Sequence, residues 1–345
     1  MLVTNYNTGV QLKNFLESKQ VNPCSILSSI IAVDNSPEEE KALSTNSIIL
    51  SIGIVSMIAK VVPWWLKIIL KIILARLPMN MHTFWRRIGI FRHGSMDKSS
   101  YAVSNFHALL DYGEINSNQC QGKTMLEVGP GDSIATGLIA ANYGMQSILI
   151  DVGSFATKQI EVYQNISNEL KLSSDGSVDL DNVTSFQQIL AKCRTEYLIE
   201  GTSSLAKVDD NSVDIVISQA CLEHVSKKEF KYFVEELYRV TAAGGSHIHS
   251  IDFKDHLGYS LHNLRFSDSF WESDLVSSSG FYTNRLRFSE MIKIFIGAGF
   301  DVAKEQTELW DVLPLEIHKF HEDFHDYEVE DFRIKEAVVV LQKNL

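Results

Sequence analysis

The chain has 345 residues, of which 45% are hydrophobic and 21% charged, a balance typical of an ordinary globular protein. Its four cysteines lie far apart without metal-type spacing, which argues against a zinc knuckle or a disulfide framework and favours a reducing compartment. The net charge of −12 argues against a nucleic-acid partner, because neutralisation of phosphates dominates that kind of binding. We therefore expect a cytoplasmic protein of one or two domains with no nucleic-acid partner.

The first third of the chain divides by composition into a polar segment, 1–46, and an apolar, basic helical region with a lid, 47–118. Residues 47–78 are the most apolar stretch, but charges interrupt it before the ~20 residues that span a bilayer. Wound as a helix, this stretch places Lys60, Lys67 and Lys71 on one narrow face. Such a basic stripe is typical of a helix lying on a membrane surface, so we expect a peripheral membrane contact through 47–78. The alternative is a helical hairpin that packs on protein.

From Gln121 onward, short apolar runs alternate with amphipathic helical stretches, the pattern of a parallel sheet covered by helices. Strands are predicted at 124–128, 147–152, 197–201, 213–219, 246–253, 300–308 and 335–342. Helices are predicted at 133–143, 227–240 and 289–298. Asp132 or Ser133 is the expected N-cap of the first of these helices. The pattern predicts one doubly wound α/β domain over 119–345, with an insertion at 254–288.

The stretch MLEVGPGDS, residues 125–133, predicts a buried strand that ends in a glycine turn and leads into a helix. Such a turn presents backbone amides to a ligand at the carboxyl edge of the sheet. Ile134 stands where a dinucleotide fingerprint requires glycine or alanine, and no GxxxxGK[ST] phosphate loop is present. Glu127 would repel a diphosphate but suits a ligand with an amino group and a sulfonium. Asp151, which ends the next strand, can accept both hydroxyls of a ribose.

The order of these blocks resembles the class I S-adenosylmethionine-dependent methyltransferases. The matching blocks, over roughly 120–345, are LEVGPGDS, LIDVG, SVDIVISQACLEHV, LYRVTAAGGSHIHSIDF and FSEMIKIFIGAGFDV. The resemblance implies a Rossmann-like fold with a seven-stranded, mostly parallel sheet, a helical N-terminal extension and S-adenosylmethionine as the cofactor. It also implies that the glycine turn holds the methionine part, the acid after the second strand the ribose, and the residues after the third strand the adenine. The cofactor candidates are Glu127, Gly129, Pro130, Gly131, Asp132, Ser133, Asp151, Val152, Thr202, Ser203 and Gln219.

Methyl transfer to a hydroxyl requires removal of its proton, and two histidines are the candidate bases. His256 follows the fifth predicted strand and is the first choice, and His224 follows the fourth, in SQACLEHV. For His224 the alternative is a purely structural role in its loop. Ubiquinone-pathway and small-RNA methyltransferases, which resemble this block, carry a metal-binding ExxEH, but this chain has Ala220 at the first acidic position. We therefore expect no metal.

The insertion at 254–288 is rich in side chains that stack on a ring and hydrogen-bond its hydroxyls. The candidate acceptor contacts are His262, Asn263, Arg265, Trp271, Tyr282, Asn284 and Arg285. The alternative is that its aromatic residues pack the insertion onto the sheet. In relatives a helix before the domain closes over the cofactor, so Arg92, His93, Met96 and Tyr101 are expected to line a lid or to form a simple connector.

The function expected from these features is O-methylation of a small or glycan/lipid-linked acceptor near a membrane surface. Glu127, Gly129, Gly131 and Asp151 are all in place, which argues for an active cofactor site. The alternative is a non-catalytic subunit of the same fold that binds the cofactor or a partner as a scaffold.

Overall fold

The computed structural model describes residues 64–66, 68–69, 96, 99–173 and 178–344. The chain divides into two compact units, Met1–Arg92 with His256–Gly258, and His93–Asp255 with Tyr259–Leu345. In the first unit, residues 64–66 and 68–69 are helical. The predictions for 1–46 and for the rest of 47–78 lie outside the described residues, as do those for Arg92 and His93.

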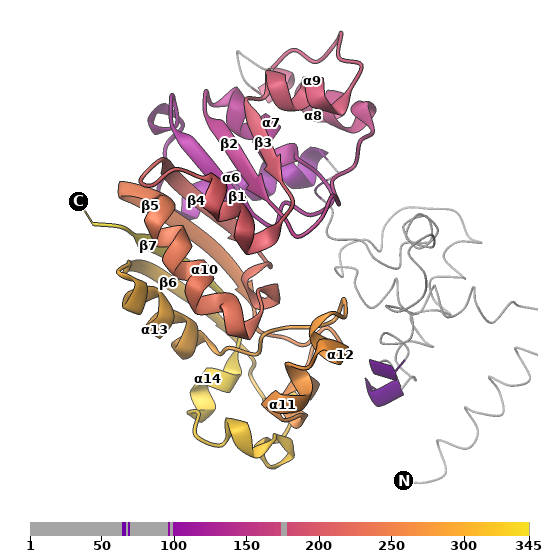
Figure 1. Cartoon of the computed structure of the whole chain (residues 1–345), viewed down its shortest axis with the longest axis vertical. Helices are drawn as coiled ribbons and strands as arrows, with labels where there is room; N and C mark the ends of the chain where they lie inside the picture. The colour runs from indigo at the N-terminus through magenta and orange to yellow at the C-terminus, as the bar shows by residue number, and fades with distance from the viewer. Residues whose placement is uncertain (1–63, 67, 70–95, 97–98, 174–177, 345) are drawn as a thin grey trace, which may run out of the picture. The chain divides into compact units, whose positions relative to one another are not determined.

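The second unit is built on a seven-stranded sheet in the order β3-β2-β1-β4-β5-β7-β6 (Figure 1). Its strands are β1 (Thr124–Val128), β2 (Gln146–Ile150), β3 (Thr195–Leu198), β4 (Val213–Gln219), β5 (Thr241–Asp252), β6 (Asp301–Leu309) and β7 (Ile334–Gln342). The first five strands are parallel, and β7 is antiparallel to both β5 and β6. This confirms the predicted mostly parallel sheet, although β5 starts at Thr241 rather than at residue 246.

Helices cover both faces of the sheet. The longer ones are α6 (Ser99–Tyr112), α7 (Ala135–Asn142), α8 (Ile160–Ser173), α9 (Phe186–Lys192), α10 (Lys227–Val240) and α13 (Phe288–Ala298). The shorter ones are α11 (Asp268–Trp271), α12 (Asp274–Ser277), α14 (Val329–Arg333), η3 (Ser117–Gln119), η4 (Gly201–Lys207), η5 (Leu222–His224), η6 (His262–Arg265), η7 (Ile317–Lys319) and η8 (Glu322–Phe324). Helices α6 to α9 share one hydrophobic core, while α10 and α13 share the core on the opposite face.

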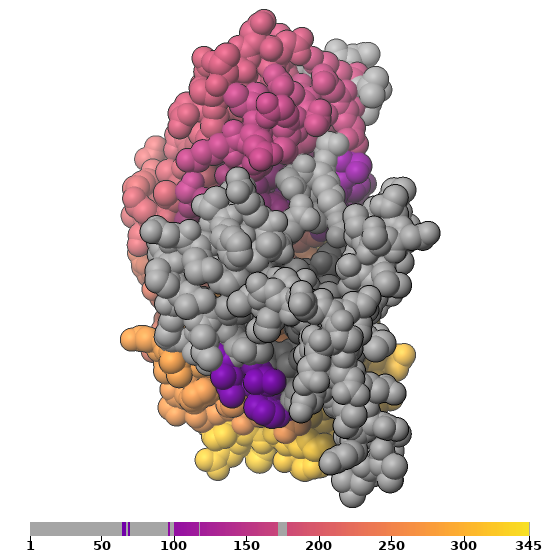
Figure 2. All heavy atoms as spheres, turned by 90° about the vertical axis from the view of Figure 1, so that its right-hand side faces the viewer, coloured from indigo at the N-terminus to yellow at the C-terminus, as the bar shows by residue number. Residues whose placement is uncertain are grey.

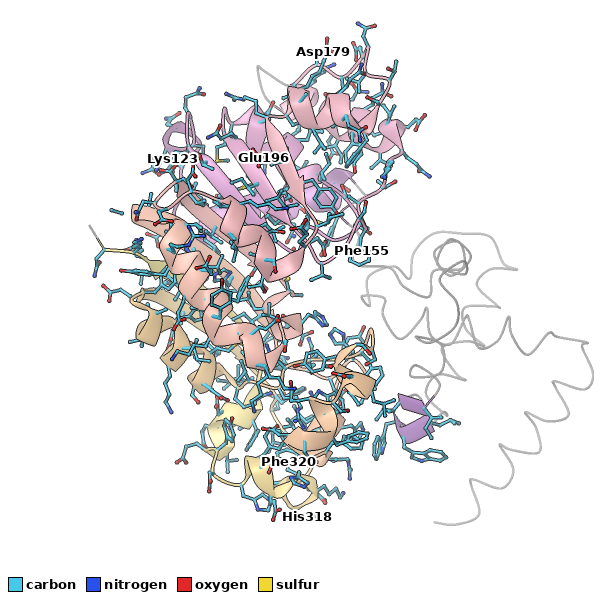
Figure 3. The ribbon with its side chains drawn as sticks, in the orientation of Figure 1. Lys123, Phe155, Asp179, Glu196, His318 and Phe320 are labelled. Atoms are coloured by element: carbon cyan, nitrogen blue, oxygen red, sulfur yellow. The ribbon has the colours of Figure 1, made fainter. Side chains whose placement is uncertain are left out.

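The strand order reverses between β1 and β4, because the chain moves outward from β1 through β2 to β3 and then returns to pair β4 with β1. In an open α/β sheet, ligands bind outside the carboxyl ends of the strands at such a switch point. Figure 3 shows the two edges: Lys123, just before β1, lies at the amino edge, and Phe155, in the loop after β2, lies at the carboxyl edge. The topology therefore places the ligand site where β1, β2 and β4 end.

The predicted N-cap of the helix after β1 is wrong. Helix α7 begins at Ala135 with Ile134 in the N-cap position, and no side chain caps it. The backbone carbonyl of Asp132 instead accepts a hydrogen bond from Thr157 N at 2.7 Å, which holds Asp132 in the loop. Ser133 is fully buried, and its hydroxyl accepts a hydrogen bond from Ala135 N at 2.9 Å. The loop after β1 is thus tied to the loop after β2, and the helix starts later than predicted.

The insertion at 254–288 packs against the segment that links β6 to β7. One hydrophobic cluster joins the two segments and consists of Leu261, Leu264, Leu315, Phe320, Phe324 and Phe332. Figure 2 shows both segments, in orange and yellow, together at its lower end, and Figure 3 labels Phe320 there. The sequence indicated the insertion but not the partner segment that completes its core.

Candidate active site

The turn after β1 has a backbone that favours glycine at two positions. Gly129 and Gly131 have φ angles of 76° and 68°, in the left-handed region that costs other residues about 1–2 kcal/mol. Gly129 N donates a hydrogen bond to Ile150 O at 2.9 Å, which ties the turn to the end of β2. A Cβ atom on Gly129 would lie 2.3 Å from the Sγ atom of Cys221, so this position has no room for a side chain. The loop after β4 therefore rests directly on the glycine turn.

Asp151 follows β2 and is oriented by the same turn. Gly131 N and Val152 N donate hydrogen bonds to its carboxylate at 3.2 and 2.7 Å. Burial nevertheless raises the pKa of Asp151 to about 6. Val152 exposes 77% of its surface, and Gly201 N donates to Asp151 O at 2.8 Å. The carboxylate of Asp151 and the exposed side chain of Val152 thus lie next to the start of η4. This start carries half-buried Thr202 and exposed Ser203.

Glu127 is a buried carboxylate at the end of β1. The Thr136 hydroxyl donates to its Oε1 atom at 3.2 Å, while Oε2 has no hydrogen-bond partner among the described residues. Burial raises the pKa of Glu127 to about 8. A buried polar atom without a partner is costly and calls for a ligand that supplies one. An amino group of a bound cofactor would supply both a donor and a positive charge.

Helix α6 is bonded to the carboxyl end of β4. The Asn105 amide donates a hydrogen bond to the Oε1 atom of Gln219, at the end of β4. It also lies 3.9 Å from the sulfur of Met96, in the turn before α6. The region predicted as a lid or connector is thus bonded to a predicted cofactor residue.

Residues 126–249 match the family model described as a methyltransferase domain. Residues 126–249 therefore carry a methyltransferase domain. The match begins at Leu126 and ends within β5, so it includes the glycine turn, Asp151 and the loop after β4. A comparison with curated proteins gives no match.

Solved structures of methyltransferases match this chain at low sequence identity. One is a SAM-dependent methyltransferase from Methanosarcina mazei, at 20% identity over 65% of this chain and 94% of that one, with a TM-score of 0.40. Another is the geranyl diphosphate C-methyltransferase of Streptomyces coelicolor, at 11% identity over 70% and 79%, with a TM-score of 0.40. A third is an arsenic(III) methyltransferase from Chlamydomonas reinhardtii, at 14% identity over 66% and 64%, with a TM-score of 0.35.

The cofactor of this methyltransferase is S-adenosylmethionine, and the residues present fit it. Glu127 offers an unsatisfied carboxylate oxygen to an ammonium group. Asp151 offers an oriented carboxylate to a pair of hydroxyls. The individual contacts of Pro130, Asp132, Ser133 and the other cofactor candidates stay predictions, and Ser133 would act through its backbone because its side chain is fully buried.

The loop after β4 has a strained backbone and is held by hydrogen bonds from the insertion. Ala220 has a φ of 43°, which is uncommon for a residue other than glycine, and strain of this kind clusters at functional sites. The side-chain amide of Asn284 donates to Leu222 O at 2.8 Å and to Val225 O at 3.0 Å. The backbone amide of Asn284 donates to Glu223 O at 2.7 Å. One fully buried asparagine of the insertion thus fixes both ends of η5.

His224 stands exposed on η5 with a defined hydrogen bond. Its Nδ1 atom lies 2.8 Å from the carbonyl oxygen of Tyr282, and because a carbonyl only accepts, Nδ1 carries the hydrogen. Nε2 is then the basic nitrogen of the neutral ring. Tyr282 is itself anchored, since Lys227 N donates to its hydroxyl at 3.1 Å and that hydroxyl donates to Glu272 Oε2 at 2.9 Å.

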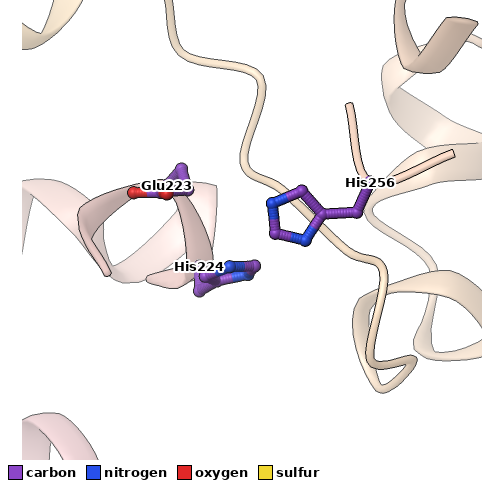
Figure 4. A group of neighbouring side chains, drawn as sticks. All are labelled: Glu223, His224 and His256. Atoms are coloured by element: carbon purple, nitrogen blue, oxygen red, sulfur yellow. The ribbon is translucent and has the colours of Figure 1, made fainter. Parts of the chain in front are cut away.

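Glu223 precedes His224, and from the sequence it is expected to orient that histidine or to contact the cofactor. It is 3% exposed, and neither carboxylate oxygen makes a hydrogen bond to a described residue. Burial raises its pKa well above the usual value. Figure 4 shows that the Glu223 carboxylate and the His224 ring leave the turn in different directions. An acid inside the apolar run between Cys221 and Val225 was the available signal for a buried charge.

The predicted acceptor contacts fall into two groups. Asn263, Trp271, Tyr282, Asn284 and Arg285 are buried, and His262 and Arg265 are half-buried. Trp271 donates to Thr283 O at 2.8 Å, and the guanidinium of Arg285 lies 5.2 Å from the Trp271 ring and 2.6 Å from Phe266 O. These bonds hold the insertion together, as the packing alternative expected. A direct acceptor contact stays a prediction, for which the half-buried pair His262 and Arg265 is the better placed.

His256, His247 and His249 lie in different settings. His256 belongs to the first unit, so its role as a base stays a prediction. His247 and His249 lie fully buried on one side of β5, with His247 Nδ1 3.2 Å from His249 Nε2. Their chain of hydrogen bonds continues to Thr241 at one end and Ser218 at the other, both at 2.8 Å. Burial lowers the pKa of His249 to about 3, so this pair is neutral and structural at physiological pH.

Proposed function

We propose that this methyltransferase transfers the methyl group of S-adenosylmethionine to an oxygen atom of a small or glycan/lipid-linked acceptor near a membrane surface. The observation that carries the oxygen acceptor is the turn directly after β4, which holds two groups that can take a proton: the imidazole of His224, whose Nδ1 is bonded to Tyr282 O, and the buried carboxylate of Glu223. A hydroxyl must lose its proton as it takes a methyl group, so a base at this place favours oxygen. His256 is a further candidate for that task.

The cofactor contacts we propose follow the strand ends. Glu127 binds the amino group, and Asp151 binds the ribose hydroxyls. Val152 and the start of η4, with Thr202 and Ser203, contact the adenine. The backbone of the glycine turn, over 129–133, binds the rest of the methionine part, and Gln219 closes the site from β4. Support comes from the unsatisfied oxygen of Glu127 and the two amides that orient Asp151.

The chemistry needs little beyond alignment. A sulfonium is already an activated methyl donor, so the transfer is a direct displacement that the protein accelerates by holding the acceptor in line with the methyl group. Donor and acceptor meet at the carboxyl edge, where η5 and the insertion are bonded to each other. His262 and Arg265 are the side chains we propose to orient the acceptor.

The membrane contact is proposed from the apolar, basic stretch at 47–78. In the first unit, Trp65 and Ile69 are four residues apart and about half-exposed, which places them on one helical face. No helix among the residues that the structure describes is long and apolar enough to cross a bilayer. Co-sedimentation with anionic liposomes tests this contact. Replacement of both residues by serine should reduce binding, and unchanged binding would contradict the proposal.

Methyl transfer to a panel of acceptors tests the proposed chemistry. Purified protein is incubated with methyl-labelled S-adenosylmethionine and with sugars, phenols, glycolipids and the matching amines. We expect label in the methyl ether of a hydroxyl compound, with the amines unlabelled. Label on nitrogen or carbon would contradict the oxygen acceptor.

A further inference from the structure

The carboxyl edge of the sheet holds more buried acid than the cofactor needs. Burial raises the pKa values of Glu127 and Asp151, and it also raises those of Glu223 and Asp252. The amino group and the ribose of the cofactor match the first two. Asp252 has its own partners, since Lys254 N donates to it at 2.8 Å and Lys254 Nζ lies 3.7 Å away. Glu223 is the remaining acid. No proposed cofactor contact uses it, and no described residue makes a hydrogen bond of normal geometry to its carboxylate.

No described residue satisfies the carboxylate of Glu223. Its two oxygens are inaccessible to solvent and make no hydrogen bond of normal geometry. Burial raises the pKa of Glu223 and the charge of Asp252 raises it further, whereas the backbone amides of Glu223 and Asp252 and the charge of Lys254 lower it. An ionised carboxylate in this setting is costly without a partner, so burial favours the protonated form of the group when no ligand is bound.

The position of Glu223 links it to the cofactor turn. It stands two residues after Cys221, whose Sγ atom fills the space beside Gly129. Burial raises the pKa of the Cys221 thiol, and the negative charges of Glu223, Asp151 and Glu127 raise it further, so all three acids act on the same thiol beside the glycine turn. A positive charge within about 4–6 Å lowers the pKa of a carboxyl group by roughly one to three pH units. The sulfonium of a bound cofactor is such a charge.

We propose that Glu223 takes the proton of the acceptor during methyl transfer and that the sulfonium charge of the cofactor ionises it beforehand. The proposal rests on the oxygen acceptor proposed above. In the transfer, a bond forms between the acceptor oxygen and the methyl carbon, and the carbon–sulfur bond breaks with its electron pair left on sulfur. The hydroxyl proton moves to the Glu223 carboxylate. The product, S-adenosylhomocysteine, has no sulfonium charge, so Glu223 keeps its proton after the transfer. When the next S-adenosylmethionine binds, Glu223 ionises again and its proton passes to water.

His224 has a different task in this arrangement. Its ring is exposed and tethered through Nδ1 to Tyr282 O, whereas the Glu223 carboxylate is buried and its backbone carbonyl is held by Asn284. The proposal therefore assigns proton removal to Glu223, and it makes His224 a positioning residue at the mouth of the site.

Activity tests the catalytic part with any hydroxyl acceptor that takes label in the panel described above. Glu223→Gln keeps the size and the neutral state of the buried group, so the variant should fold and bind S-adenosylmethionine normally. We expect its kcat to fall by about 10²–10⁴-fold, the usual contribution of a positioned base. Glu229→Gln, an exposed carboxylate on α10, is the control and should keep the wild-type rate. An unchanged kcat for Glu223→Gln would overturn the proposal.

Proton release tests the ionisation step without any acceptor. Calorimetric titrations at about pH 7, in two buffers of different ionisation enthalpy, count the protons released when S-adenosylmethionine or S-adenosylhomocysteine binds. Both ligands carry the amino group and ribose that face Glu127 and Asp151, so the difference between them isolates the sulfonium charge. We expect S-adenosylmethionine to release more protons, and we expect this difference to vanish in Glu223→Gln and to persist in Glu229→Gln.

Two outcomes of these titrations would overturn the role of Glu223 while leaving the cofactor site intact. One is equal proton release by the two ligands, and the other is a difference that persists in Glu223→Gln. Titration with Mn²⁺ alone adds a third, because binding that is lost in Glu223→Gln would make the carboxylate a cation ligand. Failure of either cofactor to bind would contradict both the proposal and the cofactor assignment. A methylated amine in the panel would contradict the oxygen acceptor and the proton transfer to Glu223 that rests on it, but not the cofactor assignment.

Discussion

Buried acids dominate the site at the scale of single residues. Glu127 is the most informative of them, because its raised pKa makes its charge state depend on the ligand. Between the ordinary value of 4.5 and the folded value of about 8, the folded protein holds a proton that the unfolded chain has lost. The free energy of unfolding of the ligand-free protein therefore falls as the pH rises through this window.

Glu127→Gln should remove that pH dependence. Glutamine cannot ionise, so relative to wild type the variant should gain stability between about pH 5 and pH 8, by up to roughly 5 kcal/mol at the upper end. Its affinity for S-adenosylmethionine should fall by about tenfold or more, because the charge-assisted bond to the amino group is lost. Urea unfolding at several pH values and calorimetric titration measure the two effects. Parallel stability profiles for the variant and wild type would contradict the buried charge.

At the scale of elements, η5 is the part of the site that depends most on its neighbours. Its sequence, LEH, has no capping side chain, and its ends are bonded to Asn284 from the insertion. Residues about 60 positions apart in the sequence thus act together. The sequence could not predict this contact, because nothing local to either segment indicates its partner.

Asn284→Ala should leave the carbonyls of Leu222 and Val225 buried without their side-chain partner. We expect the free energy of unfolding to fall by about 2–4 kcal/mol, since each unsatisfied buried group costs about 1–3 kcal/mol. Loss of this support should also lower kcat more than it weakens cofactor binding. Asn116→Ala, at an exposed residue, is the matched control and should stay within about 0.5 kcal/mol of wild type. Equal stability of the two variants would contradict the role of Asn284 as a support for η5.

Elements that carry their own pattern were predictable from the sequence. Helix α10 buries Phe230, Phe233, Val234 and Leu237 on one face, and its bounds, Lys227–Val240, are those predicted. The seven strands were predicted from short apolar runs, and the bounds of β1 and β4 match the prediction. The start of α7 was wrong, because the bond between Asp132 O and Thr157 N is a tertiary contact. The sequence suggested a pocket from the polar and aromatic composition of the insertion. The burial of Asn263, Trp271 and Arg285 could not be predicted in this way, because it depends on tertiary packing.

At the scale of the whole second unit, two segments outside the regular fold complete each other. The insertion after β5 and the link between β6 and β7 share the cluster around Phe320 and Phe324. The guanidinium of Arg285 lies 5.0 Å from the Phe324 ring, so the cluster also supports the segment that holds η5. A substitution in this cluster, which shares no residue with the turn after β1, should therefore change the free energy of unfolding more than the affinity for the cofactor.

Phe324→Ala tests this separation. Phe324 is 1% exposed, so the substitution should lower the free energy of unfolding by about 3–5 kcal/mol. The dissociation constant for S-adenosylmethionine should stay within about threefold of wild type, because the cluster and the turn after β1 share no residue. Phe270→Ala, at a side chain that is 37% exposed, should cost far less stability. A loss of cofactor binding by folded Phe324→Ala protein would show that the two regions are coupled.

The central claim is that the turn after β1 and the acid after β2 bind S-adenosylmethionine, and one calorimetric titration tests it most directly. Wild-type protein and Asp151→Ala are titrated with S-adenosylmethionine after circular dichroism has verified that both are folded. We expect saturable binding by the wild type and a dissociation constant at least about 100-fold higher for Asp151→Ala. The variant lacks the carboxylate that we propose makes two charge-assisted bonds to the ribose. No binding by folded wild type, or equal binding by the two proteins, would contradict the account.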